Sequence, residues 1–306
     1  MKKILLTGAT GMIGAAILNE CAIRGIEAVA VIRRGSDRRK RTTDSKFIKV
    51  VECGLEEIEK LPSISGDGFD AFYHLAWADT DQNGRNNAIK QNRNIEYTLQ
   101  AVKAAQKIGC GIFVGAGSQA EYGRVSKPIS EDFPPEPETA YGVAKLSAGK
   151  LSAELCRQVG IKHIWTRIFS VYGPNDSIAT MIMYCIGKLL KKEKPLLTKC
   201  EQMWDYLYCS DAARALLLAG EKGRNGAVYN IGNGICRPLI EYVKILWDEA
   251  NPGIELGVGE IEYGQRQVMH LCADITKIKK DTGFKPAVNF EQGIKETIKW
   301  CRENLQ

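Results

Sequence analysis

The sequence lacks the long apolar runs on which membrane and secreted proteins depend. It contains no stretch of 18 apolar residues, and its first apolar run, 4–6 (ILL), is too short for the core of a signal peptide. We therefore expect a cytoplasmic protein that neither crosses nor binds a membrane.

Paired cysteines and clustered histidines are also missing. No two of the ten cysteines form a CxxC motif, and the three histidines, His74, His163 and His270, are far apart in the chain. A chain of 306 residues can bury a sufficient core without disulfides. We expect the cysteines to act as small apolar residues and we predict no metal site.

Positive charge is scarce outside one segment. The net charge is +6, with 42 Lys+Arg against 36 Asp+Glu. Residues 33–41 carry six basic residues against the single Asp37, so nearly all of the excess lies in this one run. The run has no interleaved aromatic residues, which argues against nucleic acid as a partner.

The first half of the chain alternates short apolar runs with helical patterns. Hydrophobic residues make up 44% and charged residues 25%, as in ordinary globular proteins. We predict strands at 3–7, 28–32, 46–51, 70–76 and 111–116, with helices at 12–24, 87–108 and 140–158. The pattern indicates an α/β fold, a Rossmann-type doubly wound parallel sheet with a smaller discontinuous C-terminal substrate lobe. We expect a dinucleotide-binding domain over 1–170, completed by parts of 205–235, and a substrate lobe mainly over 171–306.

Three glycines follow the first predicted strand. Gly8 allows a tight turn, Gly11 lets the backbone approach a pyrophosphate, and Gly14 allows close helix–strand packing. The helix that starts here presents free N–H groups to an anion. The segment predicts a dinucleotide site.

The end of the second strand indicates which dinucleotide. An acidic residue at this position binds the adenosine ribose, whereas Arg33, Arg34 and Ser36 stand there in this chain. Both arginines can pair with a 2′-phosphate, which favours NADP (NADPH) over NAD. A basic loop in contact only with solvent is the alternative.

A tyrosine and a lysine share one helix face downstream. Tyr141 and Lys145 are four residues apart, and Ser118 ends the fifth strand. A neighbouring ammonium lowers the pKa of a phenol, so we expect Tyr141 to act as an acid/base beside Lys145. Ser118 can donate a hydrogen bond to a reacting carbonyl.

With these motifs in this order, the sequence resembles the extended short-chain dehydrogenase/reductases of the NAD-dependent epimerase/dehydratase family, which act on nucleotide sugars. The resemblance rests on the three glycines, the Ser118, Tyr141 and Lys145 set, and the segments 74–77 (HLAW), 94–95 (NI), 167–174 (RIFSVYGP), 205–211 (DYLYCSD) and 229–232 (YNIG). It implies a homodimer formed by the helices 94–108 and 140–158.

The resemblance also implies a set of binding residues. Cofactor contacts are expected from Gly8, Thr10, Gly11, Met12, Ile13, Gly14, Arg33, Arg34, Ser36, Leu55, Leu75, Ala76, Tyr141, Lys145 and Phe169. Substrate contacts are expected from Gln119, Glu121, Ser170, Trp204 and Arg266.

Departures from the family pattern narrow the expected chemistry. Gln119 and Ala120 replace the Asp-Glu pair with which 4,6-dehydratases of the family move protons, so we do not expect dehydration. Trp204 replaces an arginine that contacts the diphosphate, a role for which Arg266 and Lys199 are candidates. Trp204 is either a packing residue or a stacking surface.

The expected function is NADPH-dependent reduction of the 4-keto group of a nucleotide-linked 4-keto-6-deoxy sugar. The alternative is a nucleotide-sugar C4 epimerase that retains NAD(P). A dinucleotide sensor without catalysis is a third hypothesis, against which the intact Tyr141 and Lys145 pair argues.

Overall fold

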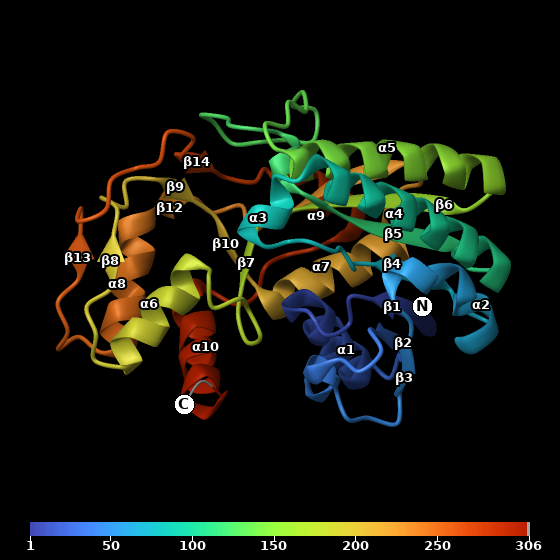
Figure 1. Cartoon of the computed structure of the whole chain (residues 1–306), viewed down its shortest axis with the longest axis horizontal. Coiled ribbons are helices and arrows are strands. Elements are labelled where there is room, and N and C mark those ends of the chain that lie inside the picture. The colour runs from blue at the N-terminus through green and yellow to red at the C-terminus, as the bar shows by residue number, and fades with distance from the viewer. Residues whose placement is uncertain (305–306) are drawn as a thin grey trace.

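A seven-stranded parallel sheet forms the centre of the computed structural model, which describes residues 1–304 (Figure 1). The strand order is β11-β6-β5-β4-β1-β2-β3, and every neighbouring pair is parallel. The strands are β1 (Lys3–Thr7), β2 (Glu27–Ile32), β3 (Ile48–Glu52), β4 (Ala71–His74), β5 (Ile112–Ser118), β6 (Lys162–Ile168) and β11 (Ala227–Ile231). This order confirms the predicted doubly wound fold, and β11 forms the edge of the sheet beside β6.

Both faces of the sheet are buried, which explains the continuous apolar runs of its strands. Successive β1 residues point to opposite sides: Leu5 packs on one face, and Ile4 and Leu6 pack on the other. Figure 1 shows α4 (Ala88–Ile108) and α5 (Ala140–Val159) together on one side of the sheet. The other face is covered by α1 (Met12–Arg24), α7 (Cys209–Lys222) and α9 (Thr276–Thr282).

The long helices begin and end where their capping residues predict. The side chains of Asn87 and Thr139 accept hydrogen bonds from the first turns of α4 and α5. Gly25, Gly109 and Gly160 end α1, α4 and α5 in the left-handed conformation, which glycine adopts without steric cost. No helix of residues 1–304 combines the length and apolar character that crossing a membrane requires.

The C-terminal part forms a second layer of elements beside the carboxyl edge of the sheet. Three helices, α6 (Met181–Leu190), α8 (Leu239–Ala250) and α10 (Phe290–Asn304), enclose their own apolar core. This part also contains three small sheets. In two of them β7 (Ser170–Tyr172) pairs with β10 (Tyr206–Tyr208), and β8 (Leu196–Leu197) pairs with β13 (Gly257–Val258). In the third, β9 (Met203–Trp204) lies between β12 (Arg237–Pro238) and β14 (His270–Leu271).

The short elements η1 (Asp37–Arg41), η2 (Leu55–Lys60), α2 (Leu61–Ile64), α3 (Gln82–Arg85) and η3 (Gln119–Glu121) lie between the main ones. Strand limits differ from the expected ones by up to two residues, with β3 beginning at Ile48 rather than at 46. Lys46 and Phe47 belong instead to the turn that leads into the strand, where the Phe47 carbonyl still accepts from the amide of Ala28.

One expectation about the cysteines is wrong. Eight of them are buried as predicted, but Cys236 and Cys272 form a disulfide across 36 residues. His270 lies beside the two sulfurs, so the fold gathers residues that sequence spacing does not group. The two cysteines are far apart in the sequence but close in space, because Cys236 adjoins β12 and Cys272 adjoins β14 of the same small sheet.

We expect Gly14→Ala to lower the free energy of unfolding by about 1–3 kcal/mol, because a Cβ would overlap with the carbonyl oxygen of Gly8. Gly187→Ala is the matched control, since a Cβ at that helical position meets no atom within 4 Å. It should raise stability by roughly 0.5–1 kcal/mol through helix propensity alone. Urea denaturation of the three proteins measures both effects. An unchanged free energy of unfolding in Gly14→Ala would contradict the close packing of this turn.

Candidate active site

Two adjoining cavities lie at the carboxyl edge of the sheet, where parallel α/β proteins bind ligands. A cavity of about 620 Å³ runs over the ends of β1, β4, β5 and β6 towards the second layer. A cavity of about 1140 Å³ continues from it between η1, α3 and the segment 175–180. Gly11, Tyr141 and Arg85 line both cavities, which makes them one continuous site.

The glycine turn forms the floor of the smaller cavity. Gly11 begins α1, and no side chain caps the first turn of this helix. A Cβ on Gly11 would meet only the carbonyl oxygen of Gly8 within 4 Å, so its outer side is open. An uncapped helix start against a side-chain-free surface suits a pyrophosphate, and these residues therefore fit a dinucleotide.

The structure brings most of the expected cofactor residues together on the cavity wall. Those that line the smaller cavity are Gly8, Gly11, Met12, Ile13, Gly14, Leu75, Tyr141, Lys145 and Phe169. Thr10, Ala76, Leu55, Arg33, Arg34 and Ser36 lie outside both cavity linings. Arg33 and Arg34 are exposed after β2, and Ser36 caps η1 by accepting from the amide of Arg38.

Ser118, Tyr141 and Lys145 all line the smaller cavity. Ser118 is the last residue of β5, while the other two extend from the first turns of α5. The ammonium of Lys145 donates to the carbonyl of Ala116 (2.6 Å) and lies 3.7 Å from the ring centre of Trp77. Trp77 also packs edge-on against the Tyr141 ring.

Burial changes the acid–base properties of this group. It raises the pKa of Tyr141, an effect that the Arg85 guanidinium and the Ser118 hydroxyl oppose. Burial lowers the pKa of Lys145 to about 7, a shift that the Glu121 carboxylate opposes and the Arg85 guanidinium adds to. Our expectation that the Lys145 ammonium would lower the pKa of Tyr141 is wrong for the protein alone. Arg85, whose guanidinium carbon lies 4.7 Å from the Tyr141 ring centre, is the nearer cation.

Glu121 does not reach the cavity, contrary to its expected role in substrate contact. It is fully buried, and its Oε1 accepts from the Ser118 amide (2.8 Å) and the Trp165 indole (3.0 Å). Its Oε2 accepts from Nε of Arg167 at 2.8 Å. Because both carboxylate oxygens accept hydrogen bonds from buried donors, Glu121 holds the backbone of Ser118 in place and does not face a ligand.

The remaining expected substrate residues surround the two cavities. Gln119, Ser170 and Trp204 line the smaller one, and Arg266 lines the larger. The Trp204 indole donates to the hydroxyl of Ser170 at 2.9 Å, so one edge of the ring is packed while the side chain still borders the cavity. Lys199, the second candidate for the diphosphate, lines neither cavity.

Sequence reasoning missed four residues of the site. Trp77 and Arg85 face Tyr141, and Arg38 and Arg41 line the larger cavity opposite the segment 175–180. Nη1 of Arg41 donates to the carbonyl of Asn175 (3.1 Å), so η1 contacts the second layer at this point. Trp77 carried a sequence signal, since it ends the HLAW segment that begins at the last residue of β4. Arg85 belongs to no recognised motif.

We expect burial of Lys145 to cost stability at neutral pH. Between about pH 7 and 10.5 the lysine is neutral in the folded state and protonated in the unfolded state. Stability therefore rises with pH in this window, by up to roughly 1.4 kcal/mol per pH unit. Lys145→Met removes this dependence, while Lys150→Met removes an exposed ammonium from the same helix and serves as the control. Urea denaturation without cofactor at pH 7 and 9 measures this pH dependence. The same change in unfolding free energy in all three proteins would contradict a neutral Lys145.

Comparison with known proteins agrees with this geometry. The chain is 25% identical over 318 residues to a dTDP-glucose 4,6-dehydratase of Streptomyces niveus, a match that covers 99% of this chain and 93% of the relative. A solved UDP-glucose 4-epimerase of Thermotoga maritima, bound to UDP-glucose, superposes with a TM-score of 0.89 at 25% identity, covering 99% of this chain and all of that one. MoeE5, solved with UDP-glucose and NAD, superposes with a TM-score of 0.82 at 25% identity over 99% of this chain and all of its own.

A family model described as the NAD dependent epimerase/dehydratase family matches residues 4–232. This range runs from the second residue of β1 to the end of β11 and includes Ser118, Tyr141 and Lys145. The match spans most of the chain and agrees with the sheet order and the glycine turn. The chain therefore belongs to the NAD-dependent epimerase/dehydratase family of extended short-chain dehydrogenase-type enzymes.

Proposed function

We propose that the protein changes the oxidation state of C4 in a nucleotide-linked sugar, with Tyr141 as the proton donor or acceptor. The observation that carries this proposal is the grouping of Ser118, Tyr141 and Lys145 on one cavity wall, beside Gln119 and Ala120 in place of dehydratase acids. An amide and a methyl group cannot protonate a leaving hydroxyl. The relatives named as nucleotide-sugar dehydratases and epimerases support the substrate class.

A nicotinamide dinucleotide, when bound, supplies the hydride chemistry of this family. The glycine turn and the first turn of α1 hold its pyrophosphate, and Lys145 lies on the same wall as Tyr141. Ser118 orients the oxygen at C4 with its hydroxyl, and Tyr141 exchanges a proton with that oxygen. Trp77 and Arg85 pack against the phenol ring and orient it on the cavity wall.

Reduction of a 4-keto-6-deoxy sugar by NADPH is the form that the site chemistry favours. Reduction needs a tyrosine that is protonated before the reaction, and burial raises the pKa of Tyr141 in that direction. The basic segment supplies the second argument, because Arg33 and Arg34 follow β2 and Arg38 and Arg41 line the larger cavity. NADPH suits an enzyme that consumes its reductant better than one that retains its cofactor.

A C4 epimerase that retains NAD(P) is the second candidate. It is favoured by the similarity to the Thermotoga maritima epimerase, which covers both chains almost completely. Epimerisation requires the 4-keto sugar to turn within the site, so that the hydride returns to the opposite face of C4. The cavity of about 1140 Å³ next to Tyr141 offers space for that rotation.

One assay separates the candidates. The protein is mixed with NADPH or NADH and a panel of UDP- and dTDP-linked 4-keto-6-deoxy sugars and hexoses, with product analysis by NMR. One mole of NADPH oxidised per mole of sugar supports reduction, whereas an inverted C4 without a change in absorbance at the nicotinamide band supports epimerisation. Binding without turnover of any sugar contradicts both and leaves the sensor hypothesis.

In this assay we expect Tyr141→Phe to lower kcat by about 10²–10⁴-fold, because the proton at the C4 oxygen loses its donor. Dinucleotide affinity should change by less than about threefold. Tyr97→Phe, a half-buried tyrosine of α4 outside both cavities, is the matched control and should retain full activity. Equal kcat values for the two variants would remove Tyr141 from the mechanism.

The cofactor preference is a separate proposal. We expect replacing Arg33 and Arg34 by Ala to weaken NADPH by about 10–100-fold and NADH by less than about threefold, since only NADPH carries the 2′-phosphate. Arg39→Ala is the control, because Arg39 pairs with Glu52 at 3.2 Å and not with the cavity. Nicotinamide fluorescence titration of the unchanged protein and both variants gives the six dissociation constants. Equal losses of affinity for both cofactors would mean that the two arginines do not recognise the 2′-phosphate.

The expected homodimer stays a prediction. Val143 and Leu151 on α5 are each 49% exposed, and Ile89 on α4 is 75% exposed, so the paired helices present apolar side chains outward. Such a surface suits a second copy of the chain. The cytoplasmic location and the absence of a nucleic-acid partner also stay predictions.

A further inference from the structure

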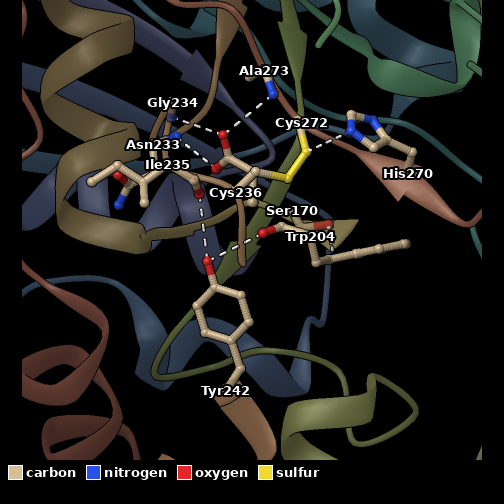
Figure 2. Close-up of a disulfide and its surroundings, with 11 residues drawn as sticks. Ser170, Trp204, Asn233, Gly234, Ile235, Cys236, Tyr242, His270, Cys272 and Ala273 are labelled. Atoms are coloured by element: carbon tan, nitrogen blue, oxygen red, sulfur yellow. Dashed lines mark hydrogen bonds between the residues drawn. A yellow bond between two sulfur atoms is a disulfide. The ribbon is translucent and has the colours of Figure 1, made fainter. Parts of the chain in front are cut away.

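Two cysteines join the outer strands of the β12-β9-β14 sheet behind the substrate wall (Figure 2). Cys236 comes directly before β12, and Cys272 directly after β14. Their Cα atoms are 5.6 Å apart, which lies within the range of a disulfide. The bond therefore spans the central strand, β9, on which Trp204 lies.

Asp205 holds the same two segments together without the sulfur bond. Its Oδ1 accepts from the amide of Asn233 (2.7 Å), and its Oδ2 accepts from the amides of Gly234 (2.8 Å) and Ala273 (3.3 Å). Figure 2 labels these three donors. One fully buried carboxylate thus anchors both the loop before Cys236 and the residue after Cys272. After reduction the two thiols remain neighbours, so the bond can open and close without unfolding.

The two sulfurs differ in their access to solvent and in their neighbours. Cys236 is half-buried in an exposed loop, whereas Cys272 is 3% exposed. Nε2 of His270 lies 3.5 Å from Sγ of Cys272, close enough to take its proton. The other eight cysteines are all buried, so this pair is the one placed for exchange with a solute among the described residues.

The disulfide braces the wall of the substrate cavity. In the sheet register Trp204 pairs with Arg237, the neighbour of Cys236, and with Leu271, the neighbour of Cys272. Trp204 in turn donates to Ser170 in the cavity lining. The segment that leads into β14 carries Arg266 and Val268, which line the larger cavity.

We propose that Cys236 and Cys272, with His270, form a reversible thiol–disulfide site that exchanges with low-molecular-weight disulfides and fixes the Trp204 wall when oxidised. The effect on substrate binding rests on the proposed function, whereas formation of the bond does not. His270 is a base for the thiol in this proposal and has no part in sugar chemistry.

The exchange balances in two steps. The more accessible Cys236 thiolate attacks a disulfide RS–SR, which forms the mixed disulfide Cys236–S–SR and releases RS⁻. Cys272 loses its proton to His270 and attacks Sγ of Cys236, which forms the Cys236–Cys272 bond and expels a second RS⁻. The two cysteines lose two electrons, and one RS–SR is reduced to two thiols.

The first test measures bond formation in glutathione buffers of graded ratio. After denaturation and alkylation, we expect ten labelled cysteines in the reduced protein and eight in the oxidised protein, with a cross-linked peptide containing residues 236 and 272. Cys236→Ser should give nine labels in every buffer, whereas Cys272→Ser should hold Cys236 as a mixed disulfide with glutathione in oxidised buffer and give eight labels. Cys110→Ala, a buried cysteine after α4, is the control and should shift from nine to seven.

Four outcomes overturn the proposal. They are ten free thiols in fully oxidised buffer, a bond that no glutathione ratio reduces in the folded protein, a cross-link between other cysteines, and one equivalent of Zn²⁺ bound to the reduced protein through Cys236, His270 and Cys272. The last outcome would make the cluster a metal site, for which these three side chains also lie close enough.

Two further measurements connect the bond with its neighbours. His270→Gln should slow bond formation at pH 7 by roughly tenfold or more, because Cys272 loses its base. The oxidised protein should melt about 5 °C or more above the reduced one, a shift that Cys236→Ser abolishes. An unchanged rate in His270→Gln overturns the role of His270.

The last measurement compares UDP and dTDP binding to both forms by calorimetry. We expect the oxidised form to bind one of them about 3–10-fold more tightly, because the wall is already ordered. Equal affinities overturn the link to the cavity. Failure of both forms to bind either nucleotide contradicts the proposed function and leaves the thiol result intact.

Discussion

The buried carboxylate of Glu121 is the interaction on which the site depends. It lies under the end of β5, where the strand stops and Ser118 begins a new turn. It satisfies the amide of that serine, the indole of Trp165 and the guanidinium of Arg167 at once. A buried ion pair of this kind contributes little net stability, and breaking it is costly, so its value lies in fixing one geometry. The position of the Ser118 hydroxyl over the cavity follows from that geometry.

Lys145 and Tyr141 lie next to this carboxylate in the site, and the burial of Lys145 lowers the stability of the fold. Lys145 is 3% exposed and makes one hydrogen bond to a backbone carbonyl, so its charged form is poorly compensated at neutral pH. Tyr141 packs against Trp77 and the guanidinium of Arg85, and burial raises the pKa of its phenol, which favours the protonated form. Desolvated groups with shifted pKa values, gathered in one cavity, are typical of catalytic sites, where function takes precedence over stability.

Part of the site could be predicted from local sequence because its residues follow directly from the elements that carry them. Gly11 begins α1, Ser118 ends β5, and Tyr141 and Lys145 share one face of α5, so their approximate meeting point at the carboxyl edge follows from the parallel sheet. Glu121 shows the limit of such inference. Its position three residues after Ser118 places it near the cavity, but the direction of its side chain depends on Trp165 and Arg167, which β6 brings from more than 40 residues away.

The sequence by itself determined the elements, their order and the glycine turn, because hydrophobic period, caps and turn residues act over a few neighbours. Tertiary structure alone decided what surrounds the tyrosine and which cysteines meet. Arg85 reaches the Tyr141 ring from a four-residue helix, and Cys236 meets Cys272 because each flanks an outer strand of one small sheet. Burial, and with it the shifted pKa of Lys145, is likewise a property of packing, since desolvation depends on every residue that excludes water and not on those adjacent in the chain.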